Sequence, residues 1–95
     1  MQLHGVIWKD KFANKIYAKH NVTTDEVEQV LFSSKYHVRG QKKGRVKGED
    51  IYLAHGQTES GRFLIVVFIY KSGNLVLPIS ARSMSRSERG YYEKR

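Results

Sequence analysis

The chain has 95 residues, a formal net charge of +8 and no cysteine. This length forms one domain, residues 1–95, with a single core, and the lack of cysteine excludes disulfide bridges, thiolate metal sites and a cysteine nucleophile. The excess of positive charge favours a polyanionic partner, either a nucleic acid or an acidic protein, over a role in solubility alone.

The chain begins with a short strand and a helix. Residues 5–8 are predicted as the strand and residues 9–20 as the helix, in which apolar side chains recur at helical spacing. These side chains are Phe12, Ile16 and Tyr17. Asn21, a residue type that tolerates the left-handed conformation, ends the helix. Lys15, Lys19 and His20 lie in or beside its last turns, where cations complement the helix dipole.

The start of a second helix is the clearest local signal in the sequence. Thr23 is expected to cap it, with Glu26 three residues later as the partner in a capping box. Val22 and Val27 flank this start as a hydrophobic staple. The helix extends to the region of Ser33 and buries one stripe, made of Val27, Val30 and Leu31.

A basic segment follows the second helix. Residues 36–39 are expected as a strand, and residues 40–48, in which glycines alternate with cations, as a mobile loop. Because the segment has no acid among its cations, it suits contacts to a phosphate backbone that need no sequence-specific geometry. The candidate RNA-binding residues are Arg39, Lys42, Lys43, Arg45 and Lys47. A solvated loop without a ligand is the alternative.

The second half of the chain predicts two consecutive β-hairpins. Residues 51–54 form a strand, and a turn at residues 57–61 leads into residues 63–70, an unbroken apolar run that we expect at the centre of a sheet. A second turn at residues 72–74 leads into a strand at residues 75–80.

The fold class follows from the order of these elements. A last helix begins at Ser85, with Glu88 as its capping-box partner and Tyr91 and Tyr92 near its end. We therefore expect an α+β fold, a small antiparallel sheet of four or five strands with two N-terminal helices and one C-terminal helix.

The hairpins bring several polar residues to one end of the sheet. The turn at residues 72–74 brings Arg62 near Arg82, although the loop length leaves open whether the two guanidiniums share a face. The first hairpin puts His55 and Gln57 close to Arg62. An arginine that only ends a strand and points into water is the alternative for each cation.

The sequence lacks the motifs of several enzyme classes. It has no metal-ligand spacing, no P-loop, no dinucleotide fingerprint and no GxSxG elbow, so we expect neither a metal nor a cofactor. No stretch has the apolar length of a signal peptide or a transmembrane helix, so we expect a cytoplasmic protein that does not bind membranes.

After these exclusions, the remaining chemical feature is a group of cations on a small sheet. Such a surface suits the cleavage of RNA without metal. In that reaction the ribose 2′-hydroxyl attacks the adjacent phosphate, and arginine forks match the negative charge that develops on the phosphoryl oxygens. In this hypothesis Arg62 and Arg82 stabilise the transition state. His20 or His55 moves a proton, since imidazole as a group ordinarily titrates at about 6.5, which suits general acid and base catalysis.

Two groups of residues resemble a known family. The N-terminal group is Trp8, Lys11, Lys15, Lys19, His20, Val22, Glu26 and Val27. The C-terminal group is Gly56, Gln57, Thr58, Gly61, Arg62, the apolar strand at residues 64–68, then Ile79, Ser80, Ala81, Arg82, Glu88, Arg89 and Tyr92. Together they resemble the BrnT toxins of bacterial toxin-antitoxin pairs over nearly the whole chain. The sequence departs from the family pattern where Lys9 separates Trp8 from Asp10, and in the basic loop.

The resemblance implies a RelE-like ribonuclease fold and a toxin whose RNA cleavage arrests translation and growth. It also implies a cognate antitoxin that neutralises the toxin and that alone contacts operator DNA. By the family pattern, Arg62 and Arg82 are the phosphate-stabilising pair, with Lys19 and His20 near the same cleft. A non-catalytic module that binds RNA or DNA, and a degenerate toxin kept for antitoxin binding, are the alternatives.

Overall fold

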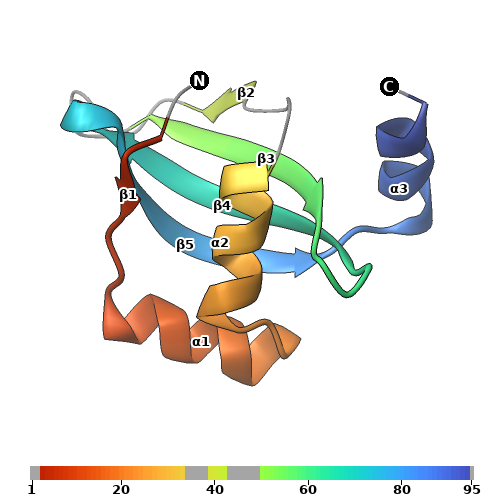
Figure 1. Cartoon of the computed structure of the whole chain (residues 1–95), viewed down its shortest axis with the longest axis horizontal. Helices are drawn as coiled ribbons and strands as arrows, with labels where there is room; N and C mark the ends of the chain where they lie inside the picture. Colours follow the sequence, from red (N-terminus) through yellow and green to blue (C-terminus); the bar gives the residue numbers. More distant parts are fainter. Residues whose placement is uncertain (1–2, 34–38, 43–49, 95) are drawn as a thin grey trace.

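The computed structural model describes residues 3–33, 39–42 and 50–94. In this part of the chain, one five-stranded sheet is accompanied by three α-helices (Figure 1). The elements are β1 (Gly5–Val6), α1 (Asp10–His20), α2 (Thr24–Ser33), β2 (Arg39–Lys42), β3 (Ile51–Gln57), β4 (Phe63–Lys71), β5 (Leu75–Ser83) and α3 (Arg86–Glu93). None of the described helices has the length and apolarity to cross a membrane.

The sheet has the strand order β1-β5-β4-β3-β2, with β4 at its centre as predicted. β4 pairs antiparallel with both β3 and β5. The turn between β4 and β5 uses positive φ angles at Gly73 (77°) and Asn74 (61°), as its sequence indicates. The expectation of a wholly antiparallel sheet is wrong at one edge, where Gly5 of β1 pairs in parallel with Leu75 of β5. No hairpin joins these two strands, so their relative direction is not constrained by a turn.

Both N-terminal helices lie close to their predicted positions. Asn21 ends α1 with a φ of 55°. At the start of α2, the backbone N–H of Glu26 donates to Thr23 Oγ1 (3.1 Å), and the backbone N–H of Thr23 donates to Glu26 Oε1 (3.0 Å), which completes the predicted capping box. The buried stripe of α1 is narrower than expected, since Ile16 is 2% exposed but Tyr17 is 58% exposed.

The core lies between the sheet and the first two helices. α1 packs along β5 and α2 packs across β3 and β4, so both cover one face of the sheet, here called the helix face (Figure 1). Alternate residues of a strand point to opposite faces, and Ile65 of β4 therefore points to the other face, here called the back face. The core of the helix face consists of Ile16, Val22, Val27, Val30, Leu31, Ala54, Leu64, Val66, Phe68, Val76 and Ala81.

Gly56 allows a close approach of β3 to α2. A Cβ at Gly56 would lie 2.9 Å from Cγ1 of Val30, a branched and fully buried side chain. We expect Gly56→Ala to lower the free energy of unfolding by about 1–3 kcal/mol, measured by urea denaturation. Gly90→Ala is the matched control, because its Cβ would meet nothing within 4 Å, and it should leave stability unchanged or raise it. An unchanged free energy of unfolding for Gly56→Ala would mean that α2 and β3 can move apart without loss of stability.

α3 packs on the back face at one end of the sheet. Ser85 and Glu88 form both hydrogen bonds of the predicted capping box at its start. The ring of Phe63 meets Tyr92 edge-on, with 5.9 Å between centroids, and lies 4.0 Å from the guanidinium carbon of Arg89. None of the residues described in α3 is fully buried, so the helix lies against the surface and contributes little to the core.

The strand β2 differs from the prediction for the basic segment. A strand is present, but it spans Arg39–Lys42, so the backbone from Gly40 to Lys42 is not the loop that the glycine and the cations indicated. Its pairing with β3 shifts between Gly40 and Lys42, and such a short, irregular and charged strand at a sheet edge has no clear sequence pattern. Residues 34–38 and 43–49 of the predicted strand and loop lie outside the described residues.

Candidate active site

The five predicted catalytic residues come from elements that meet at one end of the molecule. α1 packs along β5 and runs in the same direction, so Lys19 and His20 lie toward the end of β5 that carries Arg82 (Figure 1). The antiparallel pairing of β3 with β4 brings His55 and the start of β4, next to Arg62, to this end as well.

The two arginines nevertheless lie on opposite faces of the sheet. Arg82 pairs with Ile65, a residue of the back face. Arg62 precedes β4 and reaches α2 on the helix face. The question that the loop length left open is thereby answered, because the side chains of Arg62 and Arg82 leave the sheet on different faces.

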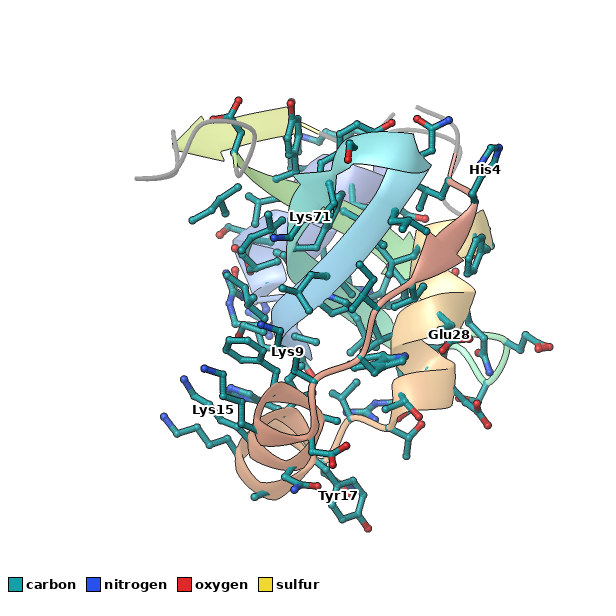
Figure 2. All side chains as sticks on the ribbon, turned by 90° about the vertical axis from the view of Figure 1, so that its left-hand side faces the viewer. His4, Lys9, Lys15, Tyr17, Glu28 and Lys71 are labelled. Atoms are coloured by element: carbon teal, nitrogen blue, oxygen red, sulfur yellow. The ribbon has the colours of Figure 1, made fainter. Side chains whose placement is uncertain are left out.

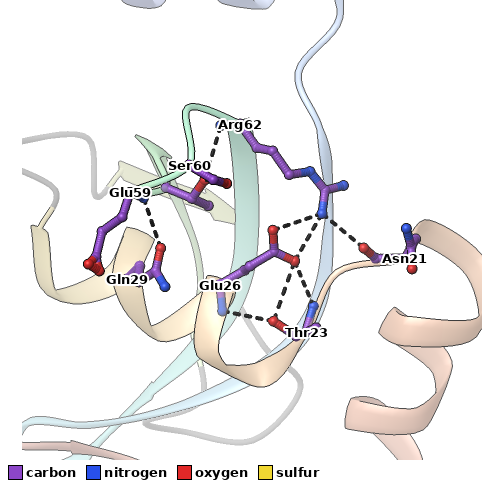
Figure 3. A network of polar contacts seen from close by, with 8 residues as sticks. Asn21, Thr23, Glu26, Gln29, Glu59, Ser60 and Arg62 are labelled. Atoms are coloured by element: carbon purple, nitrogen blue, oxygen red, sulfur yellow. Dashed lines mark hydrogen bonds and ion pairs between the residues drawn. The ribbon is translucent and has the colours of Figure 1, made fainter.

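Arg62 links the turn between β3 and β4 to the connection between α1 and α2, on the helix face (Figure 3). Its Nη1 donates to both carboxylate oxygens of Glu26 and to the backbone carbonyl of Asn21, each at 2.9 Å. Burial raises the pKa of the Glu26 carboxyl, but hydrogen bonds from the Thr23 backbone and from Arg62 outweigh it, so this pKa lies below its ordinary value. Arg62 thus fixes the backbone immediately after Lys19 and His20.

A second contact supports the same junction. The backbone N–H of Glu59, in the turn between β3 and β4, donates to Oε1 of Gln29 in α2 at 2.9 Å (Figure 3). With two attachments, the β3–β4 turn is held against α2. The geometry around Arg62 is therefore that of a structural junction beside the end of α1.

Arg82 is held by a two-pronged ion pair with α3. Its Nη1 and Nη2 donate to the two carboxylate oxygens of Glu88 at 2.7 and 2.8 Å, and Nη1 also donates to the Ser83 carbonyl at 3.1 Å. The bond from Arg82 is the main cause that lowers the pKa of Glu88 to about 2, and the same bond raises the pKa of Arg82. A guanidinium has five N–H groups, so these bonds to described residues leave two of them available.

Arg82 and His55 share the back face in one row across three strands. His55 pairs with Ile65, and Ile65 pairs with Arg82, so the three residues lie side by side on β3, β4 and β5. The Arg82 side chain is 44% exposed, and His55 is half-buried. Ser80, which sequence reasoning did not single out as a site residue, pairs with Val67 and lies on the same face.

The structure describes only a small part of the basic segment. Arg39 and Lys42 belong to β2, at the opposite edge of the sheet from β1, and only their backbone is described. Lys43, Arg45 and Lys47 lie outside the described residues. Among the residues that the structure describes, no three histidine, aspartate or glutamate side chains are grouped as metal ligands.

Comparison with known proteins identifies the family. The family model described as the ribonuclease toxin, BrnT, of type II toxin-antitoxin systems matches residues 8–88. The chain belongs to the BrnT family. The matched BrnT region runs from Trp8 to Glu88, and it therefore includes the Arg62 junction, the pair formed by Arg82 and Glu88, and the end of α1.

A crystal structure supports the same fold. The Brucella abortus ribonuclease toxin BrnT, solved at 1.1 Å resolution, superposes with a TM-score of 0.62 and 20% sequence identity, covering 90% of this chain and 100% of that chain. No curated protein sequence matches this BrnT chain. The α+β fold and the family resemblance predicted from the sequence are thus confirmed.

Acid should weaken the Arg82–Glu88 pair. The pKa of Glu88 is about 2 in the folded protein, below its ordinary value of 4.5, so the stabilisation is present above pH 4.5 and is lost as the pH falls toward 2. We expect unfolding free energies measured between pH 2 and 6 to fall more steeply for the wild type than for Glu88→Gln. The difference should reach about 1 kcal/mol at most, because the pair is exposed to solvent. Parallel pH profiles would mean that the pair adds nothing to stability.

Proposed function

We propose that this chain is a metal-independent endoribonuclease, the toxin of a type II pair, whose cleavage of RNA in the cytoplasm inhibits translation and growth. The observation that carries this proposal is the Arg82 guanidinium, which is oriented by Glu88 on an accessible face and has two N–H donors that no described residue uses. Family membership supports the ribonuclease assignment.

The proposed chemistry is an internal displacement at phosphorus. The ribose 2′-oxygen forms a bond to the adjacent phosphorus while the bond from phosphorus to the 5′-oxygen breaks, which gives a 2′,3′-cyclic phosphate and a free 5′-hydroxyl. Negative charge builds on the phosphoryl oxygens, where two donors from Arg82 are worth most in the transition state. A base takes the 2′-hydroxyl proton, and an acid protonates the leaving oxygen.

The remaining residues are assigned by their position. His55, in the row with Arg82, and His20, at the end of α1, are the candidates for proton transfer, and Lys19 is a second cation for the phosphate. We assign Arg62 a positioning role, because its bonds to Asn21 and Glu26 hold the chain after His20. Arg39, Lys42, Lys43, Arg45 and Lys47 remain candidates for contacts to the RNA backbone.

The test is incubation of the purified protein with end-labelled RNA in EDTA. We expect fragments that end in a cyclic phosphate. Binding with a steep salt dependence but without fragments would instead favour a non-catalytic RNA- or DNA-binding module. That second candidate stands on the net charge of +8, which serves binding as well as cleavage.

The partner is proposed on the same grounds. Type II membership supports a cognate antitoxin that masks the toxin and carries the contacts to operator DNA. Induction of this chain alone should arrest growth, and co-expression with its antitoxin should restore it. Growth unaffected by the chain alone would favour a degenerate toxin kept for antitoxin binding.

A further inference from the structure

α1 carries a row of lysines that the proposed chemistry does not use in full. Lys11, Lys15 and Lys19 follow one another at steps of four residues, so they lie on one stripe of the helix, and all three are exposed. Figure 2 shows Lys15 projecting on the side of the molecule opposite to Glu28 of α2, while Tyr17 points elsewhere. We call these three residues the lysine row.

Helix stability does not explain the lysine row. Like charges four residues apart destabilise a helix, and only Lys19 lies in the last turn, where a cation complements the dipole. α1 contains one acid, Asp10, and no carboxylate in the described part of the chain forms an ion pair with the row. Contacts among the described residues therefore do not explain these charges.

The surroundings of the lysine row favour a phosphate backbone over a protein. Stable protein interfaces have an exposed apolar centre. Beside the row, Asn14 and Ala18 are the exposed neighbours, Phe12 is half-buried beneath Lys11, and Tyr17 points away. Evenly spaced cations on a rigid helix suit successive phosphates, whatever the base sequence. The row also ends at Lys19, next to His20 and the backbone held by Arg62.

We infer that the lysine row binds the ribose-phosphate backbone of the substrate on one side of the scissile bond and directs it into the site at the end of β5. The inference rests on the proposed function, because it takes RNA as the ligand. Lys11 and Lys15 are the binding residues that it adds, since Lys19 is already placed in the site. The Lys11 ammonium lies 5.0 Å from the Phe12 ring, which restricts the position of its side chain.

The test removes the two outer charges. We expect Lys11→Gln with Lys15→Gln to bind a 20-nucleotide 2′-O-methyl RNA about tenfold more weakly. The slope of log Kd against log salt should fall by about 1.4, or 0.7 for each lost phosphate contact. The control, Arg86→Gln with Lys94→Gln, loses the same charge from exposed positions outside α1 and should keep most of the affinity and the slope.

The uncleavable RNA separates the inference from the proposed function. If binding and slope do not change in the α1 variant, or change equally in the control, the inference is wrong, whether or not the wild type cleaves RNA. If the wild type binds this RNA through the row but cleaves no RNA in EDTA, the proposed function fails and the inference holds. If the wild type does not bind RNA at all, both fail. A thermal unfolding midpoint equal to that of the wild type shows that the variants are folded.

Discussion

Arg82→Ala is expected to lower kcat for RNA cleavage by about 10²–10³-fold, the usual effect of removing an oriented donor that stabilises transition-state charge. The fold should persist, because the Arg82 side chain is 44% exposed and its ion pair lies at the surface. The measurement is single-turnover cleavage of a labelled RNA, together with a urea denaturation curve of the same protein.

Two further variants make the Arg82 result specific. Arg82→Lys keeps the charge but loses the fork that meets Glu88 and phosphate together, so it should restore only a small part of the rate. Arg86→Ala, an exposed arginine at the first position of α3, should cleave like the wild type. Wild-type cleavage by Arg82→Ala would remove Arg82 from the mechanism.

Arg62→Ala is expected to act mainly on stability. It removes hydrogen bonds to the Glu26 carboxylate and to the Asn21 carbonyl, and bonds to charged groups contribute about 1.5–3 kcal/mol to the free energy of unfolding. At temperatures well below the midpoint of thermal unfolding, the rate of RNA cleavage by Arg62→Ala should fall less than the rate of Arg82→Ala. A protein of unchanged stability that has lost cleavage would instead make Arg62 a substrate contact, as the sequence first indicated.

A double-mutant cycle isolates the Arg62 pair. Glu26→Gln keeps the size and the capping geometry of the side chain but removes the charge that faces Arg62. We expect a coupling energy of at least about 0.5 kcal/mol between the two substitutions. Additive effects would assign the stability of this junction to the bond with the Asn21 carbonyl alone.

Most of the fold could be predicted because its signals are local. The caps at Thr23 and Ser85 and the turn at Gly73 depend on residues within a few positions, and each is present as predicted. The edge strands β1 and β2 are less regular. Their direction and limits are set by distant partners, which neighbouring residues do not reveal.

The faces of the two arginines could not be predicted, for a definite reason. Pro78 pairs with Phe68 on the helix face, and simple alternation would put Arg82, four residues later, on that face with Arg62. An irregularity at Ile79 adds one residue to β5, so Ala81 faces the helices and Arg82 faces back. Pro78, which has no N–H for a strand ladder, is typical of such an irregularity, but it does not indicate on which face Arg82 lies.

The sequence did not indicate the carboxylates that bind Arg62 and Arg82, because both carboxylates also cap helices. Glu26 and Glu88 each stand three residues after a helix cap, at position N3 of a capping box. That role explains each of them from the sequence alone. In the structure each carboxylate also binds an arginine. A charge that caps a helix at one end of a sheet is thus available to a cation that the sequence places at the same end.

The most direct test of the central claim uses a labelled RNA with one preferred cleavage site and its copy with a single 2′-deoxyribose 5′ to that bond, each incubated with the wild-type protein in EDTA. The account predicts fragments that end in a 2′,3′-cyclic phosphate from the first RNA and no cleavage of the substituted bond in the second. Equal cleavage of both RNAs, or cleavage that appears only when a divalent metal is added, would contradict it.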